Sequence, residues 1–304
     1  MIIPFERLSH LAREERFSAV GVSRADRASD IEEGFRAWLN AGFHGEMGYL
    51  AQNFDKRMDP RLLFPGARSV VSCLAPYDVQ REEDNSEFKG GRVASFAWFR
   101  DYHLTIKERL YSLLGRLRAE YGEVEGRPFV DSAPLLDRYW ATRAGLGWIA
   151  KNTLLVSKEW GSYVFIGTLV LNVEVETTAS PIVNYCGKCR RCIDSCPTGA
   201  LFAPGRMDAR KCISYLTIEK KEELSKEEEK SLGEWAFGCD VCQNVCPWNV
   251  RRVKDSETLI NERYVSREVL TGFSYGLRSL PKETCLRRAN KGRLQRLLQM
   301  GNKG

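Results

Sequence analysis

The sequence predicts an α+β protein in which a region of mixed helices and strands is followed by a cysteine-rich region. Two observations support this prediction. Short runs rich in Val, Ile, Leu and aromatic residues alternate with helical patterns over residues 1–175. Eight of the ten cysteines fall within residues 186–246, where the composition changes. We therefore expect three parts, residues 1–178, 179–255 and 256–304.

The first part has the composition of a layered fold. Five runs, each bounded by turn residues, are typical of β-strands: residues 18–22, 69–77, 127–131, 152–156 and 163–175. Helical segments lie between most of these runs, which favours a mixed α/β or α+β arrangement without ordering the strands. Apolar side chains spaced by three and four residues predict one long helix with a face toward the core: Ile106, Leu110, Leu113, Leu114, Leu117 and Tyr121.

Composition and charge limit the class of protein. The chain has 46 Lys or Arg and 40 Asp or Glu, a net charge of +6, and residues 281–304 carry this whole excess. No apolar run reaches the roughly 20 residues that cross a bilayer, and residues 1–17 lack the apolar core of a signal peptide. We therefore expect a cytoplasmic protein, whose thiols stay reduced and serve as metal or cluster ligands. The charge run at residues 219–230 predicts a solvated helix.

The cysteines form two ferredoxin-type motifs. The first, C-x2-C-x2-C-x3-C-P, contains Cys186, Cys189, Cys192 and Cys196. The second, C-x2-C-x3-C-P, contains Cys239, Cys242 and Cys246, and Cys212 can supply the ligand that this run lacks. In bacterial ferredoxins, the cysteine before proline serves the other cluster of the pair. This rule assigns one [4Fe–4S] cluster to Cys186, Cys189, Cys192 and Cys246. It assigns a second cluster to Cys196, Cys212, Cys239 and Cys242.

Structural zinc is the alternative, since pairs of cysteines spaced C-x2-C also bind zinc. A zinc site, however, is complete with four ligands and does not need the cysteine before proline. We expect Cys73 to be a core residue and Cys285 to be incidental. The long region before the clusters suggests that electrons reach another centre there. G-x-G-x-x-G, Walker A and D-x-H-x-x-G motifs are absent from the sequence, and its three histidines are too scattered to suggest a mononuclear metal.

Further motifs are dense along the first 250 residues. They are GFHGEMGYL at 42–50, KRMDPRLLFPGARSVV at 56–71, RDYH at 100–103, FVDSAPLLDRYWATRAGLGWIAKNTLL at 129–155, ARKCISYLTIEKK at 209–221 and FGCDVCQNVCPWN at 237–249. With these motifs the chain resembles the epoxyqueuosine reductase family. The resemblance implies a nitroreductase-like cobalamin-binding catalytic domain at 1–178, a ferredoxin-like domain with two [4Fe–4S] clusters at 179–255 and a short helical basic tail at 256–304. Longer members continue into helical repeats, from which this chain departs after residue 250.

The resemblance also implies an activity. Members of this family are oxidoreductases that reduce epoxyqueuosine to queuosine in the anticodon loop of tRNA, the last step of queuosine biosynthesis. The clusters would feed electrons to base-off cobalamin, and cob(I)alamin would act on the epoxide either by attack at carbon or by electron transfer. We expect a monomer that receives electrons from an external carrier such as flavodoxin or ferredoxin. The alternatives are a corrinoid iron–sulfur reductive dehalogenase-like reductase and a ferredoxin-type electron carrier.

The resemblance assigns roles to individual residues. Asp131 is implied as the proton donor, with a pKa raised by partly apolar surroundings. From the residues alone, Asp131 could instead be a helix N-cap ahead of Pro134. Tyr102 and His103 could face the substrate, and a structural role fits His103 equally well. The residues expected to contact cobalamin are Arg57, Asp131, Lys151, Asn152, Leu155, Val156, Ser157 and Asp240.

Binding of tRNA requires basic residues, and affinity should fall as salt rises. The candidate phosphate contacts are Lys220, Lys221, Arg287, Arg288, Lys291 and Arg293, together with Arg210 and Lys211. Trp98 or Trp140 could stack on a base of the anticodon loop. We expect residues 281–304 to act as a compact grip on tRNA.

Overall fold

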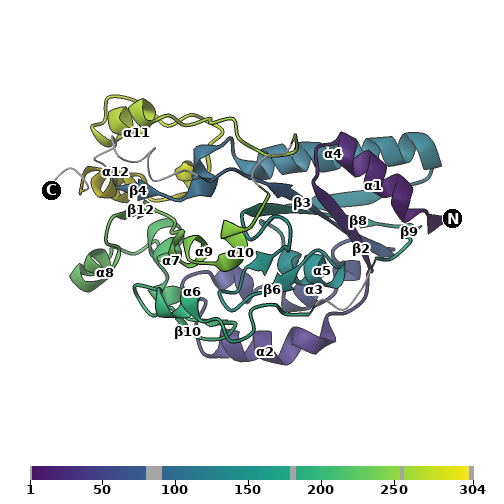
Figure 1. Ribbon diagram of the computed structural model, residues 1–304, viewed down its shortest axis with the longest axis horizontal. Helices are drawn as coiled ribbons and strands as arrows, with labels where there is room; N and C mark the ends of the chain where they lie inside the picture. Colours follow the sequence, from purple (N-terminus) through teal and green to yellow (C-terminus); the bar gives the residue numbers. More distant parts are fainter. Residues whose placement is uncertain (1, 80–90, 179–182, 254–256, 301–304) are drawn as a thin grey trace.

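A four-stranded antiparallel sheet in the order β2-β3-β8-β5 forms the centre of the first part of the molecule (Figure 1). The computed structural model describes residues 2–79, 91–178, 183–253 and 257–300. Its strands are β1 (Ile2–Ile3), β2 (Ala19–Arg24), β3 (Ser69–Pro76), β4 (Arg92–Val93), β5 (Gly126–Phe129), β6 (Trp148–Ile149), β7 (Leu155–Val156), β8 (Val164–Leu171), β9 (Glu174–Val175), β10 (Leu201–Ala203), β11 (Arg206–Met207) and β12 (Trp235–Phe237).

Helices cover both faces of this sheet. The α-helices are α1 (Phe5–Glu14), α2 (Ser29–Asn40), α3 (Phe54–Met58), α4 (Tyr102–Tyr121), α5 (Asp137–Arg143), α6 (Arg191–Asp194), α7 (Ile213–Ile218), α8 (Lys226–Ser231), α9 (Val241–Asn244), α10 (Pro247–Val250), α11 (Arg267–Ser274) and α12 (Lys291–Met300). Short 3-10 turns are η1 (Gly48–Leu50), η2 (Pro60–Leu62), η4 (Ser95–Trp98), η5 (Ala209–Lys211) and η6 (Cys285–Arg288). Helices α1 and α4 pack on one face and α5 on the other (Figure 1).

The alternation of side chains explains why both faces are covered. Along β3, Val71 and Cys73 belong to the core under α1 and α4, whereas Val70 belongs to the core on the α5 side. All eight residues of β3 are buried, as expected for a strand between two helical layers. Gly167 of β8 lets α4 come close, because a Cβ there would lie 2.6 Å from Ile106 Cγ2. The sheet is therefore a rigid platform for the loops at its ends.

A second hydrophobic core joins the middle of the chain to its last residues. Strand β4 pairs in parallel with β12, and η4 contributes Ala97 and Trp98 to this core. The C-terminal elements contribute further buried side chains to it: Leu270, Phe273, Cys285, Leu286, Leu294, Leu297 and Leu298. Residues 91–99 thus pack against the second half of the chain.

The structure confirms most of the predicted elements and corrects others. The predicted strands at 18–22, 69–77 and 127–131 and the helix around 106–121 are present. The run 152–156 forms a strand over β7 alone, and the run 163–175 breaks at Asn172, which exchanges hydrogen bonds with Glu125. The charge run is not one helix, since α8 begins at Lys226 after the Ser225 capping box.

Two further expectations concern cysteines and membranes. Cys73 is a core residue as predicted, but Cys285 is not incidental, because it is 1% exposed within the second core. Within the described ranges, no helix combines the length and the apolar character that a membrane span needs.

Candidate active site

Short helices present the cysteines of the two motifs. Cys192 lies in α6 and Cys242 in α9, while Cys212 and Cys246 are the N-cap residues of α7 and α10. Pro247 occupies the first turn of α10, where a missing backbone N–H costs nothing. The seven cysteines of the motifs and Cys212 are all free and partly exposed.

One set of thiols surrounds Cys192. Burial raises the pKa of Cys192, and the neighbouring thiols of Cys186, Cys246 and Cys189 raise it further. Burial also raises the pKa of Cys246, to which Cys186 and Cys189 contribute. Cys192 and Cys246 therefore resist ionisation unless a cationic centre compensates the charges of the neighbouring thiolates.

A second set of thiols surrounds Cys239. Burial raises its pKa to about 12, and Cys212 and Cys196 add to the effect. The pKa of Cys242 also lies well above its ordinary value because of burial and the nearby Cys212 and Cys239. Cys242 is influenced by Cys192 as well, so the two sets adjoin.

The β6–β7 hairpin contacts both sets of thiols. At its start, the indole N–H of Trp148 points at Cys186 Sγ, 3.5 Å away. At its turn, Asn152 is 4% exposed and its Nδ2 lies 3.5 Å from the Cys242 carbonyl oxygen. The hairpin therefore links the loop of one motif to the loop of the other.

The same hairpin holds most of the residues expected to contact cobalamin. The Lys151 ammonium donates to the carbonyl oxygens of Gly187 at 2.7 Å and Cys189 at 2.8 Å, so it braces the cysteine loop. Leu155–Val156 is buried, and Ser157 Oγ accepts from the backbone N–H groups of the turn that follows. Lys151 thus has partners that the sequence did not reveal.

Asp240 lies between two cysteines but points into the protein. It is 3% exposed, and its Oδ2 accepts hydrogen bonds from the backbone N–H and hydroxyl of Ser95, at 2.7 and 2.8 Å. Its Oδ1 accepts from Gln243 Nε2 at 3.2 Å. Both oxygens are therefore already engaged, and Asp240 fastens η4 to α9 instead of presenting a free carboxylate to a cofactor.

Asp131 is the centre of a polar cluster at one end of the sheet. Its Oδ2 accepts from the Tyr102 hydroxyl at 2.5 Å and lies 3.4 Å from His103 Nε2. The other ring nitrogen of His103 lies 2.6 Å from Asp101 Oδ1, which fixes the ring. His103 is nearly buried, while 60% of the Asp131 side chain is exposed and can meet a ligand.

This cluster overturns the expected protonation of Asp131. Desolvation alone would raise its pKa, but the interactions with His103 and Tyr102 outweigh it and hold the pKa below the ordinary value. Desolvation lowers the pKa of His103, but Asp101 and Asp131 outweigh it and leave the pKa raised. The cluster therefore favours an ionised Asp131 beside a His103 that holds its proton more readily than a free imidazole.

Sequence reasoning missed Asp137, the first residue of α5. Burial raises its pKa to about 7, and the charge of Asp131 adds to this shift. The Thr168 hydroxyl donates to Asp137 Oδ1 at 3.0 Å. Arg57, which is 6% exposed, lies near enough for its charge to interact with Asp137 and donates to the Tyr49 carbonyl oxygen at 2.8 Å. The one sign of Asp137 in the sequence was its position shortly after the D-S-A-P motif.

The structure does not support Arg293 as a tRNA contact, because its side chain is buried. It is 2% exposed and donates to the carbonyl oxygens of Leu216 at 3.0 Å and Lys220 at 2.6 Å, and also to that of Glu222. Arg293 therefore clamps the loop after α7. The expected grip of residues 281–304 on tRNA stays a prediction. Within this segment, η6 and α12 also complete the second core, and Lys303 lies outside the described residues.

The other proposed tRNA contacts differ in availability. Lys220 forms an ion pair with Glu228 at 2.7 Å and is mostly shielded, and Arg210 is paired with Asp208 at 2.8 Å. Lys211, Lys221, Arg287, Arg288 and Lys291 are exposed, as is Arg210 despite its ion pair. Trp98 and Trp140 are 3% and 0% exposed. Neither side chain can therefore stack on a base, and the expectation that one of them could is wrong.

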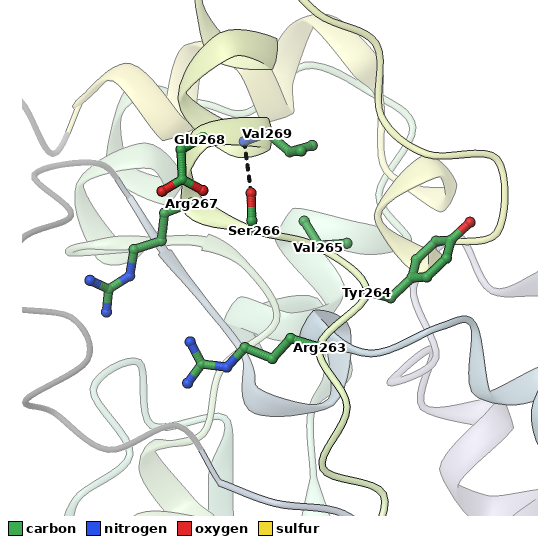
Figure 2. A pocket seen from close by; sticks show the side chains of 7 residues that line it. All are labelled: Arg263, Tyr264, Val265, Ser266, Arg267, Glu268 and Val269. Atoms are coloured by element: carbon green, nitrogen blue, oxygen red, sulfur yellow. Dashed lines mark hydrogen bonds between the residues drawn. The ribbon is translucent and has the colours of Figure 1, made fainter.

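A separate cavity lies beside the start of α11. It has a volume of about 370 Å³, and Figure 2 shows the side chains that line it, with Arg263 and Arg267 extending toward the same side. The hydroxyl of Ser266 accepts from the Val269 backbone N–H at 3.3 Å and caps the helix. The Asp131 cluster does not line this cavity.

Two family models match parts of the chain. Residues 57–132 match the family described as epoxyqueuosine reductase QueG, DUF1730, and residues 185–249 match the family described as 4Fe-4S double cluster binding domain. The first match spans Arg57, Tyr102, His103 and Asp131. The second spans the seven cysteines of the two motifs and Cys212.

Whole-chain comparisons agree with these matches. An epoxyqueuosine reductase from Leadbetterella byssophila is 46% identical over 238 residues, which is 78% of this chain and 77% of the relative. An epoxyqueuosine reductase solved with an epoxyqueuosine-modified tRNA-Tyr stem loop has a TM-score of 0.81 at 29% identity. The Bacillus subtilis enzyme, solved with its aspartate-bearing catalytic loop swung out of the active site, has a TM-score of 0.82 at 29% identity. Both alignments cover 97% of this chain and 80% of the relative.

A more distant structure shares the fold alone. A reductive dehalogenase solved with 3-bromo-4-hydroxybenzoic acid has a TM-score of 0.51 at 18% identity, over 83% of this chain and 32% of that protein.

Proposed function

The chain belongs to the epoxyqueuosine reductase family, and from this membership we propose that it reduces epoxyqueuosine to queuosine in the anticodon loop of tRNA. The reaction removes the epoxide oxygen as water and consumes two electrons and two protons. It requires an electron path, a proton source and a surface for tRNA. The observation that supports the proposal most is the exposed Asp131 carboxylate held between Tyr102 and His103.

The electron path consists of two [4Fe–4S] clusters. The double-cluster match over residues 185–249 contains eight cysteines, which is four for each cubane. We assign cluster 1 to Cys186, Cys189, Cys192 and Cys246. We assign cluster 2 to Cys196, Cys212, Cys239 and Cys242. The two sets of neighbouring thiols support this division.

Cobalamin is the cofactor that we propose between the clusters and the substrate, in its base-off form. It would supply a low-potential cobalt centre that delivers electrons to the epoxide. The residues present fit such a group, because the buried Nε of Arg57 has no hydrogen-bond partner in the described part of the chain and the β6–β7 hairpin offers a buried apolar strand. We propose the Arg57 side chain as a contact, together with Asn152, Leu155–Val156 and Ser157 through their backbone, since the polar side-chain atoms of Asn152 and Ser157 already have partners inside the protein.

The remaining expected cobalamin contacts take modified roles. We propose that Lys151 and Asp240 act indirectly, by fixing the cysteine loop and η4, because their polar atoms are engaged inside the protein. The site would then lie in a nitroreductase-like first domain over residues 1–178, next to a ferredoxin-like domain over 179–255 and a helical segment over 256–304.

The proton source is a relay in this proposal. A protonated His103 passes its proton to the Asp131 carboxylate through the 3.4 Å contact between its Nε2 and Asp131 Oδ2, and Asp131, which contacts the leaving oxygen, delivers that proton to it. Asp101 holds the imidazole ring and stabilises its charged form. Tyr102 keeps the Asp131 carboxylate aimed at the substrate.

The tRNA surface is proposed from the exposed basic residues. The candidates are now Lys211, Lys221, Arg287, Arg288 and Lys291, whose charges can meet phosphates without breaking a buried contact. All eight thiols and the Asp131 cluster come from one chain, so we propose that a monomer suffices.

The external electron donor is proposed to dock over cluster 1. Residues 183–191 contain three basic residues and no acidic one, and the Lys188, Arg190 and Arg191 side chains are exposed. Nearby, Tyr185 is 40% exposed, with Lys158 Nζ 4.2 Å from its ring centroid. An acidic one-electron carrier such as flavodoxin or ferredoxin would be attracted to this basic surface, as in other small and transient redox complexes.

The experiment that tests the proposed function uses protein purified without oxygen and reconstituted with iron, sulfide and cobalamin. We expect a visible spectrum with base-off cob(II)alamin beside the iron–sulfur shoulder. On addition of dithionite and epoxyqueuosine-containing tRNA, nucleoside mass spectrometry should detect queuosine. Cobalamin bound without formation of queuosine would reject the substrate, and absence of bound cobalamin would reject the cofactor.

A further inference from the structure

The indole ring of Trp148 lies directly against a thiol of cluster 1. Its Nε1 is 3.5 Å from Cys186 Sγ, and this N–H donates to the sulfur. The side chain is 2% exposed, so water cannot replace the sulfur as the acceptor. A cysteine that holds a cluster is a thiolate, which has lone pairs and no proton of its own. The indole is therefore placed as a hydrogen-bond donor to the cluster ligand.

The direction of this N–H is fixed by packing. Trp148 begins β6 and pairs with Val156 of β7. The two strands come close at Gly147, where a Cβ would overlap the Val156 carbonyl oxygen. Tyr185 and Trp248 pack edge-on against the Trp148 ring, at centroid distances of 5.2 and 5.0 Å. The ring therefore cannot turn its N–H away from the sulfur without disturbing this aromatic group.

The loop that carries Cys186 is held on the same hairpin. Asn184 Oδ1 accepts from the Cys186 backbone N–H at 3.0 Å, and Asn184 Nδ2 donates to the Ile149 carbonyl oxygen at 3.2 Å. The Lys151 ammonium holds two further carbonyl groups of this loop. The indole donor and its sulfur acceptor thus belong to one hydrogen-bonded unit, which keeps their separation constant.

We propose that Trp148 raises the reduction potential of cluster 1 through its hydrogen bond to Cys186, and so eases reduction of this cluster by the external carrier. The inference rests on the proposed function, which makes the two clusters the electron path. Reduction takes one electron from the carrier, breaks no bond and adds one negative charge to the cluster and its thiolates. A donor at a ligand thiolate stabilises this more negative state more than the oxidised one, which raises the potential.

The test is a redox titration of the protein loaded with both clusters and cobalamin, followed by the EPR signals of the reduced clusters. Trp148→Phe keeps an aromatic ring in the hairpin but removes the N–H. Trp248→Phe is the matched control, because it removes an indole from the same aromatic group. In the part of the chain that the structure describes, the Trp248 indole donates to no cysteine. Iron content verifies that each protein holds both clusters.

We expect one cluster potential of Trp148→Phe to fall by about 59 mV or more, which is a tenfold change in the ratio of reduced to oxidised cluster. The other cluster potential, and both potentials of Trp248→Phe, should stay within about twofold on the same scale. Two unchanged potentials in Trp148→Phe, or an equal fall in Trp248→Phe, would overturn the proposal. The expected fall together with a parent that forms no queuosine would reject the proposed function alone.

A second measurement decides the case if Trp148→Phe does not retain cluster 1. The Trp248→Phe protein is labelled with nitrogen-15 at the indole nitrogen of its tryptophans, reduced and studied by pulsed EPR. We expect a coupling between the electron spin of a reduced cluster and a labelled indole nitrogen, because Trp148 donates directly to a ligand sulfur. Absence of this coupling would overturn the proposal.

Discussion

Replacement of Arg293 by methionine tests whether the C-terminal residues are part of the folded core. The methionine keeps an apolar stem but removes every donor of the clamp. The carbonyl oxygens of Glu222 and Lys221 belong to exposed residues, and water can satisfy them. Those of Leu216 and Lys220 are shielded, and leaving each unpaired costs about 1–3 kcal/mol. We therefore expect Arg293→Met to lower the free energy of unfolding by about 2–6 kcal/mol.

The assay is denaturant unfolding under anaerobic conditions, followed by tryptophan fluorescence. Arg296→Met is the control, because Arg296 is also in α12 but is 48% exposed and pairs with Glu229 at the surface. An exposed pair contributes about 0–1 kcal/mol. Equal midpoints and slopes for Arg293→Met and Arg296→Met would refute the clamp and restore Arg293 as a candidate tRNA contact.

Two further predictions address the proton source and the electron donor. Because the pKa of His103 is raised, the parental turnover rate should be highest at low pH and fall as the pH rises through that pKa. The turnover rate of His103→Gln should be about 10²-fold lower and should no longer fall as the pH rises through this range. A pH profile equal to that of the parent would exclude the relay. Lys188→Glu with Arg191→Glu should slow cluster reduction by reduced flavodoxin at low salt about tenfold or more and leave reduction by dithionite unchanged. The control, Lys107→Glu with Lys226→Glu, carries the same change of charge at other positions. An equally slow reduction by flavodoxin in the control would contradict docking over cluster 1. Normal reduction by flavodoxin but weaker tRNA binding in the Lys188→Glu, Arg191→Glu variant would contradict it too.

Local patterns predicted the parts of the fold that depend on neighbouring residues. The spacing from Ile106 to Leu117 identified the face of α4, and Val and Ile content identified β3 and β8. Helices α1 and α2 were not assigned individually, although both alternate apolar and charged residues at helical spacing. The ion pair of Arg7 in α1 with Glu120 in α4 joins distant positions and could not be predicted from a local pattern. Pairing of β4 with β12 joins residues more than 140 positions apart, which no local pattern indicates.

The ligands of the candidate site could be predicted from motifs, whereas the protonation and burial of its side chains depend on residues that the fold brings together. The cysteine spacing gave the candidate ligands directly. The protonation of Asp131 depends on His103 and Tyr102, which α4 brings from about thirty residues away, so the expected direction of its pKa was wrong. Arg293 looked like a surface cation because its partners are backbone carbonyl groups, which a sequence does not mark.

The most direct test of the account is the amount of queuosine formed in a single turnover by the parent and by Asp131→Asn. Both proteins are loaded with clusters and cobalamin, reduced with dithionite and mixed with epoxyqueuosine-containing tRNA. We expect the parent to convert the nucleoside. The variant should bind the cofactors normally and react at least about 10²-fold more slowly, because it cannot pass a proton to the leaving oxygen. Equal rates of queuosine formation in the two proteins would contradict the role of Asp131 and the active site built around it.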